Sequence, residues 1–294
     1  MSSINEKLTR IDNNISSLKD TLGISQDAKI ETIEEKIIPK KGFIINEWDD
    51  NGNAINITYY GNYPTFAFAM GNASASENDC FIRALKNITI NGANSYARWG
   101  FYKNTSLESV NFINCTENTL FNSQSFYGCI NLKTVNLPPC HTLAAETFYN
   151  CTSLELSSLP SEIKTIQTNA FENCKKITIK SLPYVTHIDN AFRTCTALTQ
   201  MSLKNIEIVY SGGFYNCTGL RCMWLGSKYK GTSQSFLNCT NLKKIYVDQP
   251  RAIVETSQGY SVKWGAANAT IICNDDEGFI TQEEFDAIDW NSIE

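Results

Sequence analysis

The sequence has few charges and no long apolar run. Of its 294 residues, 25 are basic and 30 are acidic, which gives a net charge of −5. A protein that binds nucleic acid needs a basic stripe to displace counterions from phosphates, so this balance argues against that class. Nothing approaches the roughly 18 apolar residues of a membrane span, and the N-terminus lacks the basic start and apolar stretch of a Sec signal peptide. We therefore expect no nucleic-acid binding, no membrane insertion and no signal peptide.

Residue types that perform catalysis are also scarce. The chain has two histidines, His141 and His187, and we interpret both as surface residues. No Cys-x-x-Cys pair, Gly-x-Ser-x-Gly elbow or phosphate-binding loop occurs. A pair of carboxylates for glycoside hydrolysis could come from four residues, although any chain with 30 acids offers such pairs by chance: Glu146, Glu155, Glu162 and Glu172. We expect no catalytic residue, no cofactor and no metal site, and hence no enzyme.

One pattern, Phe-x-x-Cys-Thr-x-Leu, recurs along most of the chain. Seven copies open on a phenylalanine, at spacings of 21 to 25 residues: Phe101, Phe126, Phe148, Phe171, Phe192, Phe214 and Phe236. The first copy has Asn104 in place of cysteine. The other six have a cysteine three residues after the phenylalanine: Cys129, Cys151, Cys174, Cys195, Cys217 and Cys239. A period of this length is typical of solenoids, in which a coil buries its apolar face only by stacking on the next. These phenylalanines and cysteines, from Phe126 on, are predicted to form the core.

Each repeat contains two short segments with strand-like patterns. Leu132, Val135 and Leu137 show one of them, in which alternate side chains face the core and the polar ones between face water. A second apolar pair, such as Ile163 and Ile166, precedes the next phenylalanine. Ser157 and Lys180 occupy apolar strand positions, so regular strands are doubtful between residues 154 and 182.

The eleven cysteines do not indicate a disulfide scaffold. Their number is odd, the chain is long and no signal peptide is evident, whereas disulfide-rich domains are short and secreted. Six of the eleven occupy the repeat position. We interpret these six as small, buried, apolar residues at the corner of each coil.

Residues 1–39 have the heptad spacing of a coiled coil. Apolar residues at alternating intervals of four and three predict a seam for self-association: Ile4, Leu8, Ile11, Ile15, Leu18 and Leu22. The seam residues do not choose between a dimer and a trimer. The alternative is an amphipathic helix that folds back on its own chain.

The segments that flank the repeats are predicted to cover the ends of the stack. In residues 40–79, β-rich runs at 43–48 and 54–60 surround Asn51-Gly52, a strong hairpin signal, and this hairpin is predicted to cap the first coil. Residues 248–294 are predicted to form the other cap, with closing strands at 245–247, 253–254 and 270–272 and a helix after Thr281. Part of an EF-hand pattern overlaps this region, but its first position is Cys273, a poor calcium ligand. A capped turn into a terminal helix is the favoured interpretation.

Aromatic residues follow the repeat phenylalanine in four copies: Tyr102, Tyr127, Tyr149 and Tyr215. If phenylalanine points inward, these side chains point outward in a row along one edge. Tyrosine is common at recognition surfaces because it is rigid and amphipathic. The row is therefore a candidate ligand-binding face. The alternative is that tyrosines of neighbouring coils stack on one another and only stabilise the corner.

The repeat resembles the BspA-like class of leucine-rich repeats. Ala170-Phe171-Glu-Asn-Cys174 and Ala191-Phe192-Arg-Thr-Cys195 match its pattern well, and the likeness covers about residues 85–247. The resemblance implies a mainly β leucine-rich-repeat solenoid over residues 80–247, with the hairpin cap and the helical coiled-coil segment before it. Family members on bacterial and protist surfaces act as adhesins.

The flanks resemble segments that bracket such repeats in tail proteins of phages and prophages. They are Gly42 to Gly52 and Trp264 to Ile271. The resemblance implies a tail fibre or receptor-binding subunit in the virion tail, assembled in the host cytoplasm. Its N-terminus would attach to other tail or baseplate proteins as a dimer or trimer, and its rod would recognise a glycan or protein of the host surface. The alternatives are a bacterial surface adhesin and, in a different class, a tail-associated glycan depolymerase.

Overall fold

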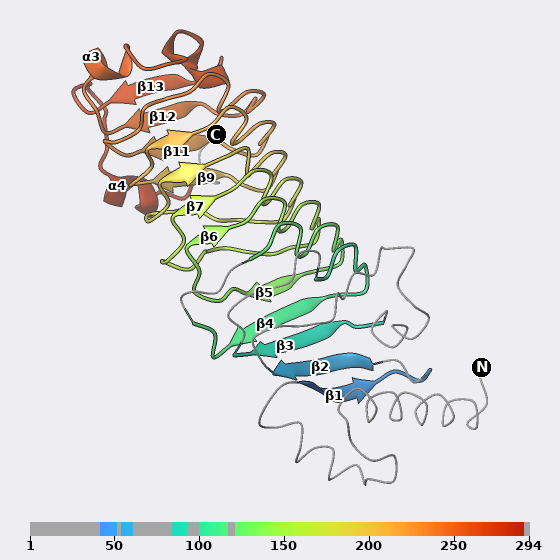
Figure 1. Cartoon of the computed structure of the whole chain (residues 1–294). Helices are drawn as coiled ribbons and strands as arrows, with labels where there is room; N and C mark the ends of the chain where they lie inside the picture. Colours follow the sequence, from blue (N-terminus) through green and yellow to red (C-terminus); the bar gives the residue numbers. More distant parts are fainter. Residues whose placement is uncertain (1–41, 52–53, 61–83, 93–99, 117–120, 291–294) are drawn as a thin grey trace, which may run out of the picture.

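The computed structural model describes residues 42–51, 54–60, 84–92, 100–116 and 121–290. These residues form an elongated stack of coils, in which strands from successive coils lie side by side along the length of the rod (Figure 1). The helices in this part of the chain are too short and too polar to span a membrane. The predicted heptad seam, Ile4 to Leu22, lies outside the described residues, and the predicted division into four segments stays a prediction.

Three sheets run along the stack, and every strand pair is parallel except β1 with β2. The first contains β1 (Gly42–Trp48), β2 (Ala54–Tyr60), β3 (Asn87–Asn91), β4 (Ser109–Ile113) and β5 (Thr134–Asn136). The second contains β6 (Thr142–Leu143), β7 (Thr165–Ile166), β8 (His187–Ile188) and β10 (Ile208–Val209). The third contains β9 (Gln200–Leu203), β11 (Cys222–Leu225), β12 (Lys244–Val247) and β13 (Thr270–Cys273).

The first two strands pair with each other and with the repeat stack. β1 and β2 are antiparallel, with an irregularity between Ile45 and Glu47, and β2 runs parallel to β3 with Ile57 beside Ile88. That pairing supplies hydrogen-bond partners to one edge of β3, which would otherwise be open. The function of this pair as a cap stays a prediction.

The phenylalanines of successive coils stack face to face in the interior. From Phe101 to Phe236, neighbouring ring centroids lie 5.2–5.8 Å apart, and all but the last pair are nearly parallel. None of these rings is more than 2% exposed. Backbone bonds hold the same register: the amide of Phe148 donates to the carbonyl of Ala170 at 2.8 Å, one coil further on.

The repeat cysteines are hydrogen-bond donors as well as packing residues. Each thiol lies 2.9–3.1 Å from the carbonyl oxygen of the phenylalanine one coil earlier, as Cys174 does with Phe148. Burial raises the pKa of the thiols of Cys151 and Cys195, so these two stay protonated and can donate. All ten cysteines in the described part of the chain are free thiols.

The corner of each coil is bent by left-handed residues two positions before and two positions after the phenylalanine. After it, positive φ angles occur at Lys103, Gly128, Asn150, Asn173, Thr194, Asn216 and Asn238. Before it, they occur at Gln124, Glu146, Asn169, Asn190, Gly212 and Gln234. Asparagine and glycine tolerate this conformation best, which explains why they recur at the second position after phenylalanine.

Two coils lack a strand on one face, at the positions where the sequence has polar residues in place of apolar ones. On the face that carries β5 and β9, the two coils between them form no strand, and only an isolated bridge joins Ser181 to Ser202. Ser157 and Lys180 are exposed in these coils. Because they occupy apolar strand positions, they remove side chains that would have anchored a strand against the core.

Two further predictions are wrong, one about the C-terminal part and one about the strands of the repeat. Ile253 and Val254 lie in the short helix α3 (Arg251–Val254), not in a strand, because Pro250 ends the extended chain and the backbone N–H of Arg251 donates to Asp275. The polar positions of the strands were expected to face water, yet Gln200 and Ser202 of β9 are buried.

The outward face of the third sheet is covered by the chain's own C-terminal segment. Helix α4 (Gln282–Ala287) begins after Thr281, as predicted, and Thr281 forms a capping box with Glu284. It lies against the face of the sheet, near β9 (Figure 1). The indole N–H of Trp224 donates to the carbonyl of Ile280, and that of Trp290 to Phe285. Phe285 and Trp290 thus form a second, smaller core with the outward residues of β11 and β12.

The last regular coil is closed by the 3-10 segment η2 (Tyr260–Gly265). The amide of Phe236 donates to the carbonyl of Trp264 at 2.9 Å, which takes the place of the next coil's carbonyl. Trp264 is fully buried and packs edge-on against Tyr229. A large aromatic side chain therefore ends the dry interior at this end of the rod.

Thr194 is the only β-branched residue with a positive φ in the described part of the chain, at 58°. A β-branched side chain is strained in this conformation, which costs about 1–2 kcal/mol even for an ordinary residue. We predict that Thr194→Asn raises the free energy of unfolding by about 0.5–1 kcal/mol. Urea denaturation followed by circular dichroism measures the change. Asn216→Thr, at the same position of the next coil, should lower stability by a similar amount, and a stabilising Asn216→Thr would contradict this account.

Candidate recognition surface

Three of the four predicted tyrosines lie in one stack at the edge of the rod. The rings of Tyr102 and Tyr127 are 4.9 Å apart, and those of Tyr127 and Tyr149 are 4.6 Å apart and nearly parallel. All three are half-buried. Both faces of the Tyr127 ring and one face of each of the other two rings are covered by a neighbouring tyrosine, so the stack presents mainly edges and hydroxyl groups to a ligand.

The fourth tyrosine lies three coils further on, and charged residues occupy the two coils between. Nε of Arg193 lies 3.7 Å from Oε2 of Glu172, and its guanidinium lies over the ring of Tyr215, 4.9 Å from the centroid. The hydroxyl of Tyr215 accepts a hydrogen bond from Asn238. We name the edge ladder as the six side chains in this row: Tyr102, Tyr127, Tyr149, Glu172, Arg193 and Tyr215.

Burial sets the electrostatics of the edge ladder. It raises the pKa of Tyr127, with smaller contributions from the neighbouring tyrosines and from Glu146 and Glu172. It also raises the pKa of Glu172, against the opposing effect of Arg193, while Glu146 adds to the increase. The ladder therefore offers hydroxyl donors and one carboxylate beside one guanidinium, a set of groups that suits hydrogen bonding to polar ligands.

The structure places the other sequence candidates in separate surroundings. Nδ1 of His141 lies 3.2 Å from the carbonyl of Glu162, and His187 bonds with the neighbouring Thr186. Glu146 accepts a hydrogen bond from Gln124, and Glu155 pairs with Lys176. Of the four carboxylates, Glu172 belongs to the edge ladder, Glu146 lies near it, and Glu155 and Glu162 lie elsewhere.

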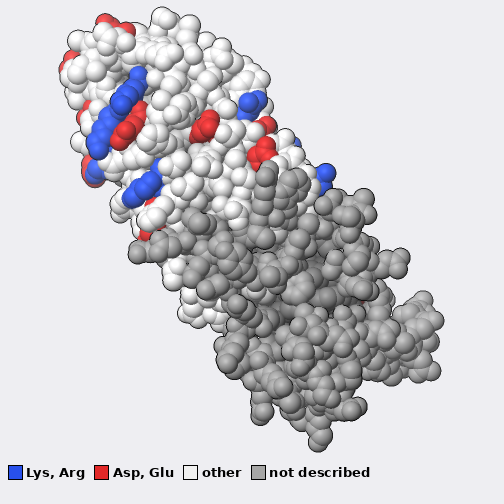
Figure 2. All heavy atoms as spheres, in the orientation of Figure 1, with Lys and Arg blue, Asp and Glu red and all other residues white. Residues whose placement is uncertain are grey.

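Charged residues are sparse and mixed on the rod. On the face seen in Figure 2, basic and acidic side chains lie interspersed over the C-terminal half, separated by wide uncharged areas. Several ion pairs join consecutive coils, such as Lys133 with Glu108 at 2.8 Å. Exposed pairs of this kind contribute little to stability, typically about 0–1 kcal/mol.

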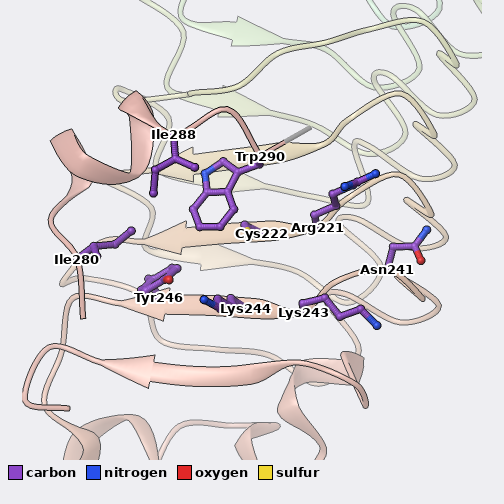
Figure 3. Close-up of a pocket in the computed structure, with 9 residues that line it drawn as sticks. All are labelled: Arg221, Cys222, Asn241, Lys243, Lys244, Tyr246, Ile280, Ile288 and Trp290. Atoms are coloured by element: carbon purple, nitrogen blue, oxygen red, sulfur yellow. The ribbon is translucent and has the colours of Figure 1, made fainter. Parts of the chain in front are cut away.

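A pocket that was not predicted from the sequence lies beside β11 and β12 (Figure 3). Its volume is about 510 Å³. Nine of the described residues line it: Arg221, Cys222, Asn241, Lys243, Lys244, Tyr246, Ile280, Ile288 and Trp290. It forms because the C-terminal segment covers only part of the outward face of the sheet. The one signal in the sequence was that Cys222, Trp224 and Tyr246 are apolar or aromatic at outward positions, where β9 has Gln200 and Ser202.

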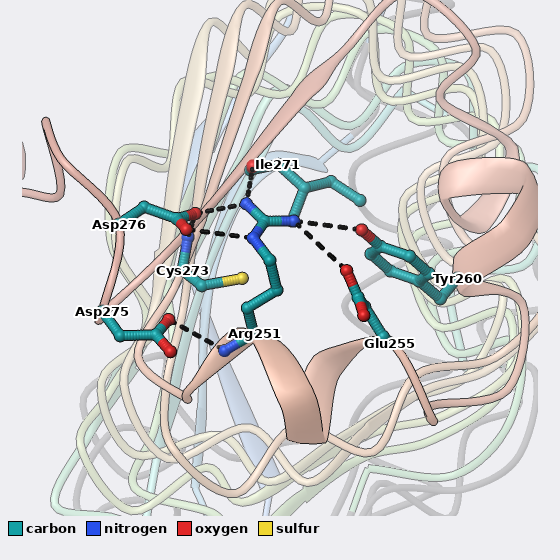
Figure 4. A network of polar contacts seen from close by, with 7 residues as sticks. All are labelled: Arg251, Glu255, Tyr260, Ile271, Cys273, Asp275 and Asp276. Carbon is teal, nitrogen blue, oxygen red and sulfur yellow. Dashed lines mark hydrogen bonds and ion pairs between the residues drawn. The ribbon is translucent and has the colours of Figure 1, made fainter.

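Two acidic residues of the EF-hand-like region, Asp275 and Asp276, bond to Arg251 (Figure 4). The carboxylate of Asp276 accepts hydrogen bonds from Nε and a terminal nitrogen of Arg251 and from the amide of Cys273. These bonds lower the pKa of Asp276. Arg251 also donates to the hydroxyl of Tyr260 and to the carbonyl of Ile271. Within the described residues, no group of three or more histidine, cysteine or acidic side chains could hold a metal ion.

Comparison with known families identifies the repeat. The model of the BspA type leucine rich repeat region matches in six copies, over residues 71–178 and 176–260. The chain belongs to this family. The match covers the whole edge ladder, and it ends before the C-terminal segment that forms one wall of the pocket. No curated protein matches the chain.

Three solved structures are similar to this BspA-type chain. A leucine-rich repeat protein from Bacteroides ovatus is 18% identical, with a TM-score of 0.38, and the match covers 81% of this chain and 76% of that one. The T. pallidum leucine rich repeat protein is 15% identical, with a TM-score of 0.33 and coverages of 79% and 96%. A leucine rich cell surface protein from Faecalibacterium prausnitzii is 15% identical, with a TM-score of 0.24 and coverages of 84% and 95%.

Arg193→Gln tests how the edge ladder is held together. The change removes the cation beside Glu172 and over Tyr215, and we expect a loss of about 0.5–1.5 kcal/mol at pH 7. Glu172 already has a raised pKa in the folded state, and loss of Arg193 raises it further. The ionised carboxylate then disfavours folding, and this penalty disappears as the pH falls and the group becomes protonated. Urea denaturation should therefore show a larger loss at pH 7 than at pH 4.

The matched control for Arg193→Gln is Lys176→Gln. Lys176 pairs with Glu155 at 3.4 Å, and both side chains are more than half exposed, at 55% and 61%. Its removal should change stability little at either pH. An equal loss for Arg193→Gln at pH 4 and pH 7 would show that Glu172 is not coupled to Arg193.

Proposed function

We propose that this protein is a non-enzymatic recognition protein whose repeat rod binds a host cell surface. The observation that supports it best is the edge ladder. One coil after another places a half-buried aromatic or charged side chain at the same edge, and together they form a continuous row. Rigid amphipathic side chains on a rigid scaffold bind with little loss of conformational entropy.

The setting we propose is a phage tail, in which the protein is a fibre or receptor-binding subunit. The heptad spacing of Ile4 to Leu22 and the resemblance of the flanking segments to those of tail proteins support it. Several rods on one stalk would multiply weak contacts, since linked sites gain avidity without any new contact per rod. The antiparallel pair β1 and β2 would cap the first coil. A bacterial surface adhesin of the same repeat family is the alternative, and neighbouring genes for tape-measure, baseplate and lysis proteins would favour the phage.

The proposed helical stalk implies that the full chain is an oligomer in solution. Light scattering of the full chain should give a dimer or trimer, whereas a chain that starts at residue 40 should be a monomer, because the heptad seam is then absent. Leu8→Asp with Ile15→Asp in the full chain should have the same effect, because charges at seam positions cannot be buried. Equal monomeric masses for the full and shortened chains would contradict the stalk.

If the edge ladder recognises the host surface, replacing its tyrosines should weaken binding to host cells. The triple change Tyr127→Ser, Tyr149→Ser and Tyr215→Ser should reduce binding of the labelled full chain to host cells at least tenfold, because it removes the rings and most of the outward contact area. Circular dichroism controls for folding. Tyr184→Ser is the matched control, since Tyr184 is 49% exposed and lies outside the ladder.

Two results would count against this proposal. Unchanged cell binding by the folded triple variant would remove the ladder from recognition. New reducing ends in purified host glycan after incubation with the protein would contradict the non-enzymatic function and favour a depolymerase.

A further inference from the structure

A second row of side chains runs along the rod at the position after the last leucine of the repeat motif. Early in the row, Glu108, Lys133 and Glu155 alternate in sign, and Lys133 pairs with Glu108 at 2.8 Å. At the C-terminal end, the same position holds Arg221 and then Lys243, whose amide donates to the carbonyl of Arg221 at 2.8 Å. Like charges side by side on adjacent strands are destabilising. This end of the row thus departs from the alternation of charge sign seen earlier, because two cations follow each other.

The departure coincides with the pocket. The register of β11 and β12 places Lys244 beside Cys222, so a third cation stands on the same outward surface. Lys243 and Lys244 are exposed, and none of the nine residues that line the pocket is acidic. Arg221 and Lys244 both oppose the rise that burial causes in the pKa of Cys222, which reaches about 12, so both lie within electrostatic reach of the pocket floor.

The opposite wall of the pocket is apolar. It consists of Ile280, Ile288 and Trp290 from the C-terminal segment, with the ring of Tyr246 below them (Figure 3). Trp290 is held in place by its hydrogen bond to Phe285, at 3.2 Å. Small-molecule sites are mostly apolar, have a few convergent polar groups and measure about 300–1,000 Å³. This pocket, of about 510 Å³, meets each of these criteria.

We propose that this pocket binds an acidic sugar residue. The carboxylate would lie against Lys243 and Lys244, the hydroxyl groups near Asn241, and the apolar face of the ring against the wall that contains Ile288 and Trp290. A sugar ring with a carboxylate combines the anionic group and the apolar face that this arrangement requires. The choice of a sugar rests on the proposed recognition of a host surface, whose glycan it would identify as acidic.

Glucuronate and glucose test the inference, because they differ only in the carboxylate. Titration of the full chain, followed by saturation-transfer NMR, should give saturable binding of glucuronate and at least tenfold weaker binding of glucose. Lys243→Gln with Lys244→Gln should weaken glucuronate binding at least tenfold. Lys228→Gln with Lys230→Gln removes two exposed cations that do not line the pocket, and it should leave the affinity unchanged.

Three results would overturn the inference: equal binding of glucose, equal affinity in the Lys243 and Lys244 double variant, or binding of inorganic sulfate as tight as that of glucuronate. Host-cell binding by the same proteins separates this inference from the proposed function. A chain that binds cells but not glucuronate would leave the recognition function standing without this site. A chain that binds glucuronate in the pocket but binds no cells would leave the site without the proposed recognition function.

Discussion

The whole structure depends on the vertical register of the coils. Each repeat phenylalanine stacks on the next at 5.2–5.8 Å, and each repeat thiol donates to the carbonyl of the phenylalanine one coil earlier. No coil can bury its apolar side alone, so stability is a sum of contacts between neighbours. Removing a buried phenylalanine such as Phe171 would cost about 3–5 kcal/mol, and because it stacks on Phe148 and Phe192 the loss would fall on two interfaces.

The sequence predicted those parts of the fold that repeat. A constant spacing of Phe and Cys indicated a solenoid, and polar residues at Ser157 and Lys180 indicated where strands would fail. Two features of the repeat are visible in the sequence, but their physical causes are not. Asparagine recurs after the phenylalanine because the backbone is left-handed there, and the thiols of residues such as Cys174 donate hydrogen bonds. Both follow from backbone geometry, which a pattern of apolar residues does not report.

The parts that could not be predicted are those that occur once. Helix α4 and its capping box were evident from Thr281, but its place on the sheet face depends on Trp224 and Ile280, which are 56 residues apart. No periodic signal encodes such a contact. The row of tyrosines was predicted from the spacing of the repeat, but its continuation was not. That Glu172 and Arg193 continue it depends on the ion pair and on the ring of Tyr215, and only the structure places these three together.

Stacking also governs the chemistry of the surface. The neighbours of an outward side chain are the same positions of the coils above and below, so surface groups form rows. Most rows satisfy themselves: Tyr127 stacks on Tyr149, Lys133 pairs with Glu108, and Asn111 accepts a hydrogen bond from the next coil. A row whose side chains already bond or stack with one another has few groups left to bind a ligand. Recognition is therefore expected where a row presents hydroxyl groups along its outer edge, as the tyrosine stack does, or where like charges follow each other, as beside β12.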